Sequence, residues 1–444
     1  MSSSILTNIY TLSEIFNRPL QIPDYQRPYK WREEHVYQLL NDLLDNFEKN
    51  ERTYRLGTIV IHKEKDKTHF DIVDGQQRSI TLSLLLKNLG KEVSFLESRV
   101  APLSARNIIR NNQIIRTFIE SRINNKESFL NYILSKCEMV YIELSSVEEA
   151  FQFFDSQNAR GKPLEPYDLL KAYHLREMQD EHDQVVFNAV ENWESAVESK
   201  DEKATLKMII NETLFKLRVW HRGDGAEVFQ NRHISQFKGV GKHAKYPYLR
   251  PLLAGQAMYD ANQSNPFLYN DIFEKPAFQI NQVIINGKYF FDYIDYYRKA
   301  YDFLFHFRTG YLNKFGLIPS DEKTLLEFLR THKGIYRTGD WYLLILFKCN
   351  VLFYFDKFGL EKLDEAISLI FKWVYKTRLE QERISFRTIE NLVHDDRSLT
   401  KVIEYALEPN DVLSFLLNPL EKVNYLNAQD IQEILEKMGV IDVK

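Results

Sequence analysis

Residues 71–79, DIVDGQQRS, constrain the fold most, because a short apolar run passes through a glycine directly into a helical pattern. The sequence predicts a β-strand, a turn at Gly75 and a helix over residues 76–89. The first turn of a helix presents free N–H groups and the positive end of the helix dipole, and both attract phosphate. The alternative is a simply capped helix, with Asp74 as the N-cap and Gln77 as its capping-box partner.

The side chains of this segment add to its chemistry. Gln76 and Gln77 supply donors, and the planar guanidinium of Arg78 suits a phosphate. Gly75 is needed for a positive φ angle or for close approach of another backbone. Asp74 can hold Mg²⁺ through a hard oxygen, and it can cap the helix as well if water bridges the metal. The segment therefore indicates a site for nucleotide or nucleic-acid phosphate.

Composition limits the classes of protein that fit. The chain has 444 residues and a net charge of −4, so any contact with DNA must use a local basic patch. Its two cysteines, Cys137 and Cys349, indicate a reducing compartment without a disulfide framework. No Cys/His spacing is typical of a zinc site. The apolar run 341–355 is shorter than a bilayer span and predicts a buried helix, so we expect a cytoplasmic protein without membrane contact.

Patterning predicts two parts, an α+β domain with a small sheet over residues 1–180 and a mainly α-helical domain over 181–444. Thr11 and Glu14 predict a capping box that opens a short helix, and residues 22–31 are expected to be extended. Strands are predicted at 54–62, 68–73 and 137–144. Helices are predicted at 33–49, 76–89, within 103–135, and at 147–155, 167–178, 181–198, 203–220, 293–308, 322–332, 340–356, 361–378, 399–407 and 429–438.

Two further segments carry polar groups suited to nucleic acid. In residues 22–31, IPDYQRPYKW, Gln26 and Arg27 can bind phosphate or a base edge, and Tyr29 and Trp31 can stack on a base. The alternative is a loop whose aromatic side chains pack on the sheet. Asn158 and Arg160 lie in the turn NARGK, which offers similar contacts or is an ordinary turn between helices. Lys171, on the following helix, is expected at the surface.

Residues 232–245, RHISQFKGVGKHAK, form a basic loop without an acidic residue. Its cations are Arg232, Lys238, Lys242 and Lys245, and its two glycines predict mobility. The loop could grip a DNA backbone, or it could be a solvated run of charge.

Four blocks together resemble the N-terminal domain of GmrSD-type restriction endonucleases, which are type IV systems that attack modified DNA. The blocks are IPDYQRPYKW (22–31), YRLGTIVI (54–61), IVDGQQRSITLSLLL (72–86) and FFDSQNARGKPLEPYDLLKA (153–172). The DGQQR segment also resembles the phosphate-binding box of ParB-type domains, where GERR stands in its place. The resemblance implies a ParB-like domain that binds a nucleoside triphosphate with Mg²⁺.

The resemblance also implies roles for single residues. It makes Asp74, Gln77 and Arg78 the catalytic group, with Asp74 positioning metal or water. The expected nucleotide-binding residues are Gln26, Arg27, Gly75, Gln76, Asn158 and Arg160.

The family often carries an HNH-type nuclease, whose metal site needs a His pair and an Asn. His394, in VHDD, lacks a second His nearby in the sequence, so the nuclease is expected on a partner chain or absent. Our hypothesis is a subunit that binds and hydrolyses a nucleoside triphosphate and gates attack on foreign DNA, such as modified phage DNA. The alternatives are a non-enzymatic switch that binds DNA or a partner, and a nuclease with an unrecognised site in the helical half.

Overall fold

The computed structural model describes most of the chain and divides it into two units. The described residues are 6–23, 29–63, 68–93, 102–144, 165–178, 180–197, 204–226, 228–264, 278–316, 324–420, 422–423 and 428–441. The first unit comprises residues 1–175 with 182–194, and the second comprises 176–181 with 195–444. The fold is α+β with a small sheet near the N-terminus and a mainly helical remainder, as predicted.

The described part of the first unit contains a mixed sheet in the order β1-β5-β3-β4-β2. Its strands are β1 (Leu6–Thr11), β2 (Leu20–Gln21), β3 (Tyr54–His62), β4 (Phe70–Asp74) and β5 (Cys137–Leu144). The pairs β1/β5 and β3/β4 are antiparallel, and the pairs β3/β5 and β2/β4 are parallel. The predicted strands β3, β4 and β5 are confirmed, whereas β1 and β2 were not predicted.

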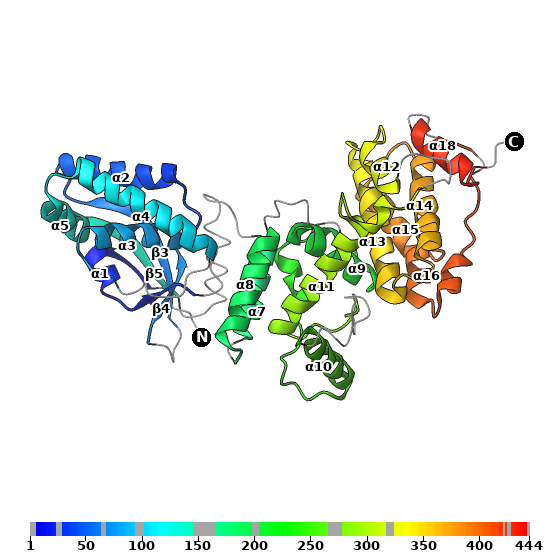
Figure 1. The fold of residues 1–444 in the computed structure, drawn as a ribbon, viewed down its shortest axis with the longest axis horizontal. Helices are drawn as coiled ribbons and strands as arrows, with labels where there is room; N and C mark the ends of the chain where they lie inside the picture. The colour runs from blue at the N-terminus through cyan, green and yellow to red at the C-terminus, as the bar shows by residue number, and fades with distance from the viewer. Residues whose placement is uncertain are drawn as a thin grey trace. The chain divides into compact units, whose positions relative to one another are not determined.

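Helices α1 to α5 lie around the strands of the sheet (Figure 1), and their apolar side chains share one core with β3, β4 and β5. The helices are α1 (Leu12–Phe16), α2 (Glu33–Glu48), α3 (Gln76–Asn88), α4 (Pro102–Arg122) and α5 (Lys126–Lys136), followed by α7 (Pro166–Arg176) and α8 (Asp183–Val197). The capping box of Thr11 and Glu14 at α1 is confirmed. Helix α3 is buried on nearly all sides, which holds its first turn in place at the end of β4.

Lys171 on α7 lies in the interior, so the expectation of a surface position is wrong. Its ammonium group donates to Glu194 Oε1 at 2.6 Å, and the two side chains are 1% and 9% exposed. A buried cation is tolerated when a carboxylate pairs with it, and this carboxylate comes from another helix, α8.

The second unit is built of helices around α13. The elements are η3 (Lys207–Leu214), α9 (Phe215–Trp220), η4 (Asn231–Phe237), η5 (Pro247–Leu249), α10 (Arg250–Ser264), α11 (Lys288–Phe305), η6 (Tyr311–Asn313), α12 (Leu325–Thr331), α13 (Thr338–Phe358), α14 (Leu363–Glu380), α15 (Phe386–His394), α16 (Leu399–Tyr405), α17 (Pro409–Leu413) and α18 (Gln429–Lys437). Helix α13 confirms the buried helix that the apolar run predicts. The single helix predicted over 203–220 is instead a π-helix, η3, that continues into α9.

Buried cations hold loops of the second unit against α9. Arg218 Nη1 donates to the backbone oxygens of Ile280 and Gln282 at 2.6 and 2.9 Å. Lys216 Nζ donates to the backbone oxygen of Ala226 at 2.7 Å. These bonds satisfy loop carbonyls that would otherwise be buried without a partner.

Both cysteines are buried and free. No helix among the described residues is both long and apolar enough to cross a bilayer.

Candidate phosphate site at the β4–α3 junction

Gly75 forms the turn between β4 and α3 in the way that its sequence context predicts. Its φ angle is +88°, a conformation that side chains with a Cβ rarely adopt. A Cβ on Gly75 would also lie 3.1 Å from the backbone oxygen of Thr58 on β3. Both reasons for a glycine, the positive φ and the close backbone approach, therefore apply at this turn.

The alternative of a capping box between Asp74 and Gln77 is wrong. Gly75 is the N-cap of α3, and Asp74 Oδ1 accepts a hydrogen bond from the Gly75 N–H at 2.7 Å. Gln77 Oε1 instead accepts from the backbone N–H of Lys30, at 2.8 Å. Asp74 lies one residue before the N-cap, and its hydrogen bond is to the Gly75 N–H rather than to an N–H of the first helical turn. Within the described chain, no side chain caps this helix N-terminus.

The guanidinium of Arg78 lies in a space that Gly57 on β3 leaves open. Gly57 has a φ angle of +107°, and a Cβ on it would lie 2.7 Å from Arg78 Nη1 and 3.2 Å from Cζ. Burial lowers the pKa of Arg78, while the charges of Asp74 and Tyr54 act to raise it. An arginine nevertheless stays protonated at neutral pH. Among the described residues Arg78 has no hydrogen bond or ion pair, so its donors remain available to an anion.

Gly57 is a site residue that sequence reasoning missed. It stands in the block YRLGTIVI, which predicted a strand and contributed to the family resemblance, but no role was given to its glycine. A glycine inside a strand pattern is itself a signal for a bulge or a close approach. The register of β3 against β5 does shift between Arg55 and Thr58, on either side of Gly57.

Tyr29 is fully buried, so in this structure it cannot stack on a base. Its hydroxyl bonds Thr81 Oγ1 on α3 at 2.8 Å and accepts from Asn111 Nδ2 on α4 at 3.0 Å. Trp31 packs partly buried against the same core, with its ring stacked on His35. The packing alternative thus describes both aromatic side chains, because the polar partners of Tyr29 lie inside the domain.

Only part of the predicted nucleotide site can be placed. Gln76 is buried at the start of α3, beside Gly75 and Gln77. The predicted ligands Gln26, Arg27, Asn158 and Arg160 lie outside the described residues. Over the described ranges, no three His, Cys, Asp or Glu side chains gather to hold a metal ion, and the role of Asp74 as a metal ligand stays a prediction.

The basic loop contains regular structure, and its backbone packs closely at Gly239. Residues 231–237 form η4, and Val240 pairs with Ile285 in a short parallel bridge. A Cβ on Gly239 would lie 1.7 Å from the Ile284 backbone oxygen, so this glycine permits backbone packing.

The four predicted DNA-binding cations of this loop differ in their surroundings. Lys242 Nζ donates to Glu181 Oε1 at 2.8 Å, and this bond raises the pKa of Lys242. Arg232, Lys238 and Lys245 are exposed. The acidic partner of Lys242 lies outside the loop sequence, which is why the loop looked free of acidic residues.

Two known families match parts of the chain. Residues 8–175 match the family described as the GmrSD restriction endonuclease, N-terminal domain. The first part of the chain is therefore a GmrSD-type domain, as the four blocks predict. Residues 186–433, more than half of the chain, match a family of unknown function (DUF7834), and the chain belongs to that family. None of the curated proteins compared with the chain matches it.

Proposed function

We propose that this protein is a nucleoside-triphosphate-binding and -hydrolysing subunit of a type IV restriction system. The observation that carries the proposal is that Arg78, whose guanidinium has no partner among the described residues, belongs to the first turn of α3, and no described side chain caps the N-terminus of that helix. A planar cation and a helix N-terminus that lie together can bind the same phosphate group. The match of residues 8–175 to a restriction endonuclease domain supports the assignment of the protein to a restriction system.

Each residue of the junction has a role in this proposal. Arg78 binds a phosphate oxygen, and Gly75 lets the chain turn so that the first turn of α3 faces it. Asp74 Oδ1 is held by the Gly75 N–H, which leaves Oδ2 for Mg²⁺ or for water that attacks the terminal phosphate. Gln77 acts with Asp74 and Arg78 in hydrolysis. The further nucleotide-binding residues in this proposal are Gln26, Arg27, Gln76, Asn158 and Arg160.

Hydrolysis would gate the recognition or cutting of foreign DNA, including modified phage DNA, in this proposal. The cutting itself belongs to a partner chain with an HNH-type nuclease. The name of the matching family, a restriction endonuclease, supports DNA as the target.

Isothermal titration of the full chain with each nucleoside triphosphate and Mg²⁺ tests the proposal. Arg78→Ala should weaken binding by about 1.5–3 kcal/mol, the contribution of a hydrogen bond to a charged group. Arg116→Ala is the matched control, because Arg116 lies exposed on α4 and pairs only with Glu120 among the described residues. Phosphate release by the wild type then separates hydrolysis from a binding-only switch. Equal binding by wild type and Arg78→Ala would exclude the β4–α3 junction as the nucleotide site.

A further inference from the structure

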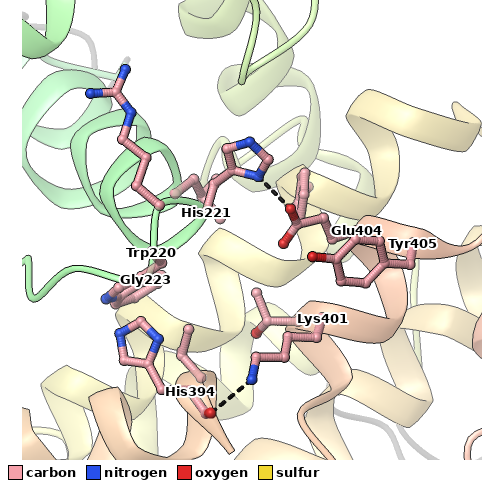
Figure 2. Close-up of a pocket in the computed structure, with 12 residues that line it drawn as sticks. Trp220, His221, Gly223, His394, Lys401, Glu404 and Tyr405 are labelled. Atoms are coloured by element: carbon pink, nitrogen blue, oxygen red, sulfur yellow. Dashed lines mark hydrogen bonds and ion pairs between the residues drawn. The ribbon is translucent and has the colours of Figure 1, made fainter. Parts of the chain in front are cut away.

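The second unit contains a pocket of about 300 Å³ between the end of α9, α15 and α16 (Figure 2). The turn that follows α9 supplies His221, Arg222 and Gly223, and α15 supplies His394. Helix α16 supplies Lys401, Glu404 and Tyr405. The two histidines are far apart in the sequence, so the pattern of residues gave no sign that they line one pocket.

The lining contains two cations, Arg222 and Lys401, and one carboxylate, Glu404. Arg222 is exposed and has no partner in the described parts of the chain. Lys401 Nζ donates to the His394 backbone oxygen at 2.8 Å and lies 3.9 Å from the exposed carboxylate of Asp396. An anion that enters this pocket can therefore contact two cations that stay charged at neutral pH. The carboxylate of the pocket, Glu404, is already hydrogen-bonded to His221 Nδ1.

Aromatic surface lies beside these cations. Tyr405 is 75% exposed, although its ring is large and mostly apolar, and Trp220 lines the pocket at 4% exposure. A base can stack on an exposed tyrosine whatever its identity, because every base has a π-face. Figure 2 shows Tyr405, Glu404 and Lys401 among the residues that line the pocket.

Two ring nitrogens at this pocket lack hydrogen-bond partners within the described chain. They are Trp220 Nε1 and His394 Nε2, and both are buried. Buried polar nitrogens are normally paired, so a site that leaves two of them unpaired is incomplete as a protein interior.

From this combination of cations, an exposed aromatic ring and unpaired ring nitrogens, we propose that the pocket binds one nucleotide unit, a phosphate with its base. Arg222 and Lys401 contact the phosphate, and Tyr405 stacks on the base. The unit can come from a free nucleotide or from a strand of nucleic acid, since both present the same groups. The inference does not rest on the function proposed for the β4–α3 junction, which belongs to the other unit.

The test uses the full chain carrying Arg78→Ala, so that the first site is disabled while the second is measured. Isothermal titration is carried out with each deoxynucleoside monophosphate, with a mixed-sequence single-stranded oligonucleotide and with inorganic phosphate. Arg222→Ala should weaken nucleotide binding about 10- to 100-fold, because it removes a charge-assisted hydrogen bond to the phosphate. Tyr405→Ala should weaken it at least about fivefold, because it removes the stacking surface.

Matched controls separate the pocket from general effects of charge and aromatic surface. Arg383→Ala removes an exposed arginine that does not line the pocket, and Tyr336→Ala removes a tyrosine that is 98% exposed elsewhere. Neither control should change the affinity. All four positions are exposed, so circular dichroism and the melting temperature should show each variant folded.

The outcomes are distinct. Monophosphate binding that both pocket variants weaken supports the proposal with a free nucleotide as ligand. Binding of the oligonucleotide alone, weakened in the same way, supports it with a strand as ligand. Binding of inorganic phosphate with no contribution from Tyr405 overturns it, and so does the absence of binding or an equal decrease in the control variants.

Discussion

Gly57 leaves room for the guanidinium of Arg78: a Cβ atom on Gly57 would lie 2.7 Å from Arg78 Nη1. The two residues come from different blocks of the sequence, one on β3 and one on α3, and their contact joins the strand to the proposed phosphate site. Replacement of Gly57, which does not itself contact the ligand, should therefore weaken ligand binding by displacing Arg78.

Gly57→Ala should weaken nucleoside-triphosphate binding, because its methyl group would displace the Arg78 guanidinium. It should also destabilise the fold by about 1–2 kcal/mol, since φ at this position is +107°. Gly90→Ala is a matched control, because Gly90 has φ +93° but no atom within 4 Å of an added Cβ. Isothermal titration and thermal unfolding of both variants measure the two effects. Unchanged nucleotide affinity in a folded Gly57→Ala protein would show that the Arg78 guanidinium does not bind the ligand.

Tyr29→Phe should destabilise the protein by about 1–3 kcal/mol, because it leaves buried polar partners on α3 and α4 without the hydroxyl. Urea unfolding measures the change. Tyr37→Phe is the control, since Tyr37 is 41% exposed on α2. DNA affinity should be the same in Tyr29→Phe and wild type, because the ring is buried. If Tyr29→Phe were as stable as wild type but bound DNA more weakly, the result would support the prediction that Tyr29 contacts DNA.

Asp356 should make stability depend on pH between about 4 and 7. Burial raises its pKa from 3.8 to about 7, while its carboxyl group accepts from Tyr297 Oη at 2.5 Å and from the Ile280 N–H at 3.0 Å. A raised carboxyl pKa means that the folded state holds the proton more tightly than the unfolded state. The stabilisation is complete below pH 3.8 and is lost as pH rises through about 7.

Asp356→Asn should flatten this dependence, because an amide does not titrate in this range. The free energy of unfolding is measured by urea titration at intervals from pH 4 to 8. Asp364→Asn serves as the control, since Asp364 also accepts from a tyrosine hydroxyl but is exposed. Its profile should follow the wild type. A profile for Asp356→Asn that keeps the wild-type slope would contradict the assignment.

The cations of the basic loop should contribute unequally to DNA binding. Replacement of Arg232, Lys238 and Lys245 by Ala should flatten the salt dependence, by roughly 0.9 in the log–log slope for each phosphate that is no longer neutralised. Lys242→Ala should change it little, because Glu181 already neutralises this ammonium. DNA affinity at several salt concentrations is the measurement. An unchanged slope in the triple variant would identify the loop as a solvated run of charge.

Local chemistry was predictable where neighbouring residues determine it. The turn at Gly75, the capping box of Thr11 and Glu14, and strand β5 all follow from short sequence patterns. The N-cap of α3 was not predicted correctly, because Gly75, with its φ of +88°, is itself the N-cap and Asp74 lies one residue before it.

Residues whose partners are remote in sequence escaped prediction. Lys171 resembles a surface lysine until Glu194 is placed beside it, and Lys242 looks unpaired until Glu181 is. The same holds for β1, whose only cue is a short mixed pattern and whose pairing partner is β5. In each case the deciding contact comes from tertiary structure, which a local pattern does not contain.

Strand β5 lies between β1 and β3, and both strands are made much earlier than it during translation. Until residues 137–144 leave the ribosome, β1 has no neighbour among the described strands of the sheet and β3 has only β4. Pairing over such long stretches of chain is slow, and unpaired strand edges invite association with other chains. A nascent chain that stalls before residue 144 therefore exposes the unpaired edges of both β1 and β3. We expect its tendency to aggregate to fall once β5 is released and pairs with both strands.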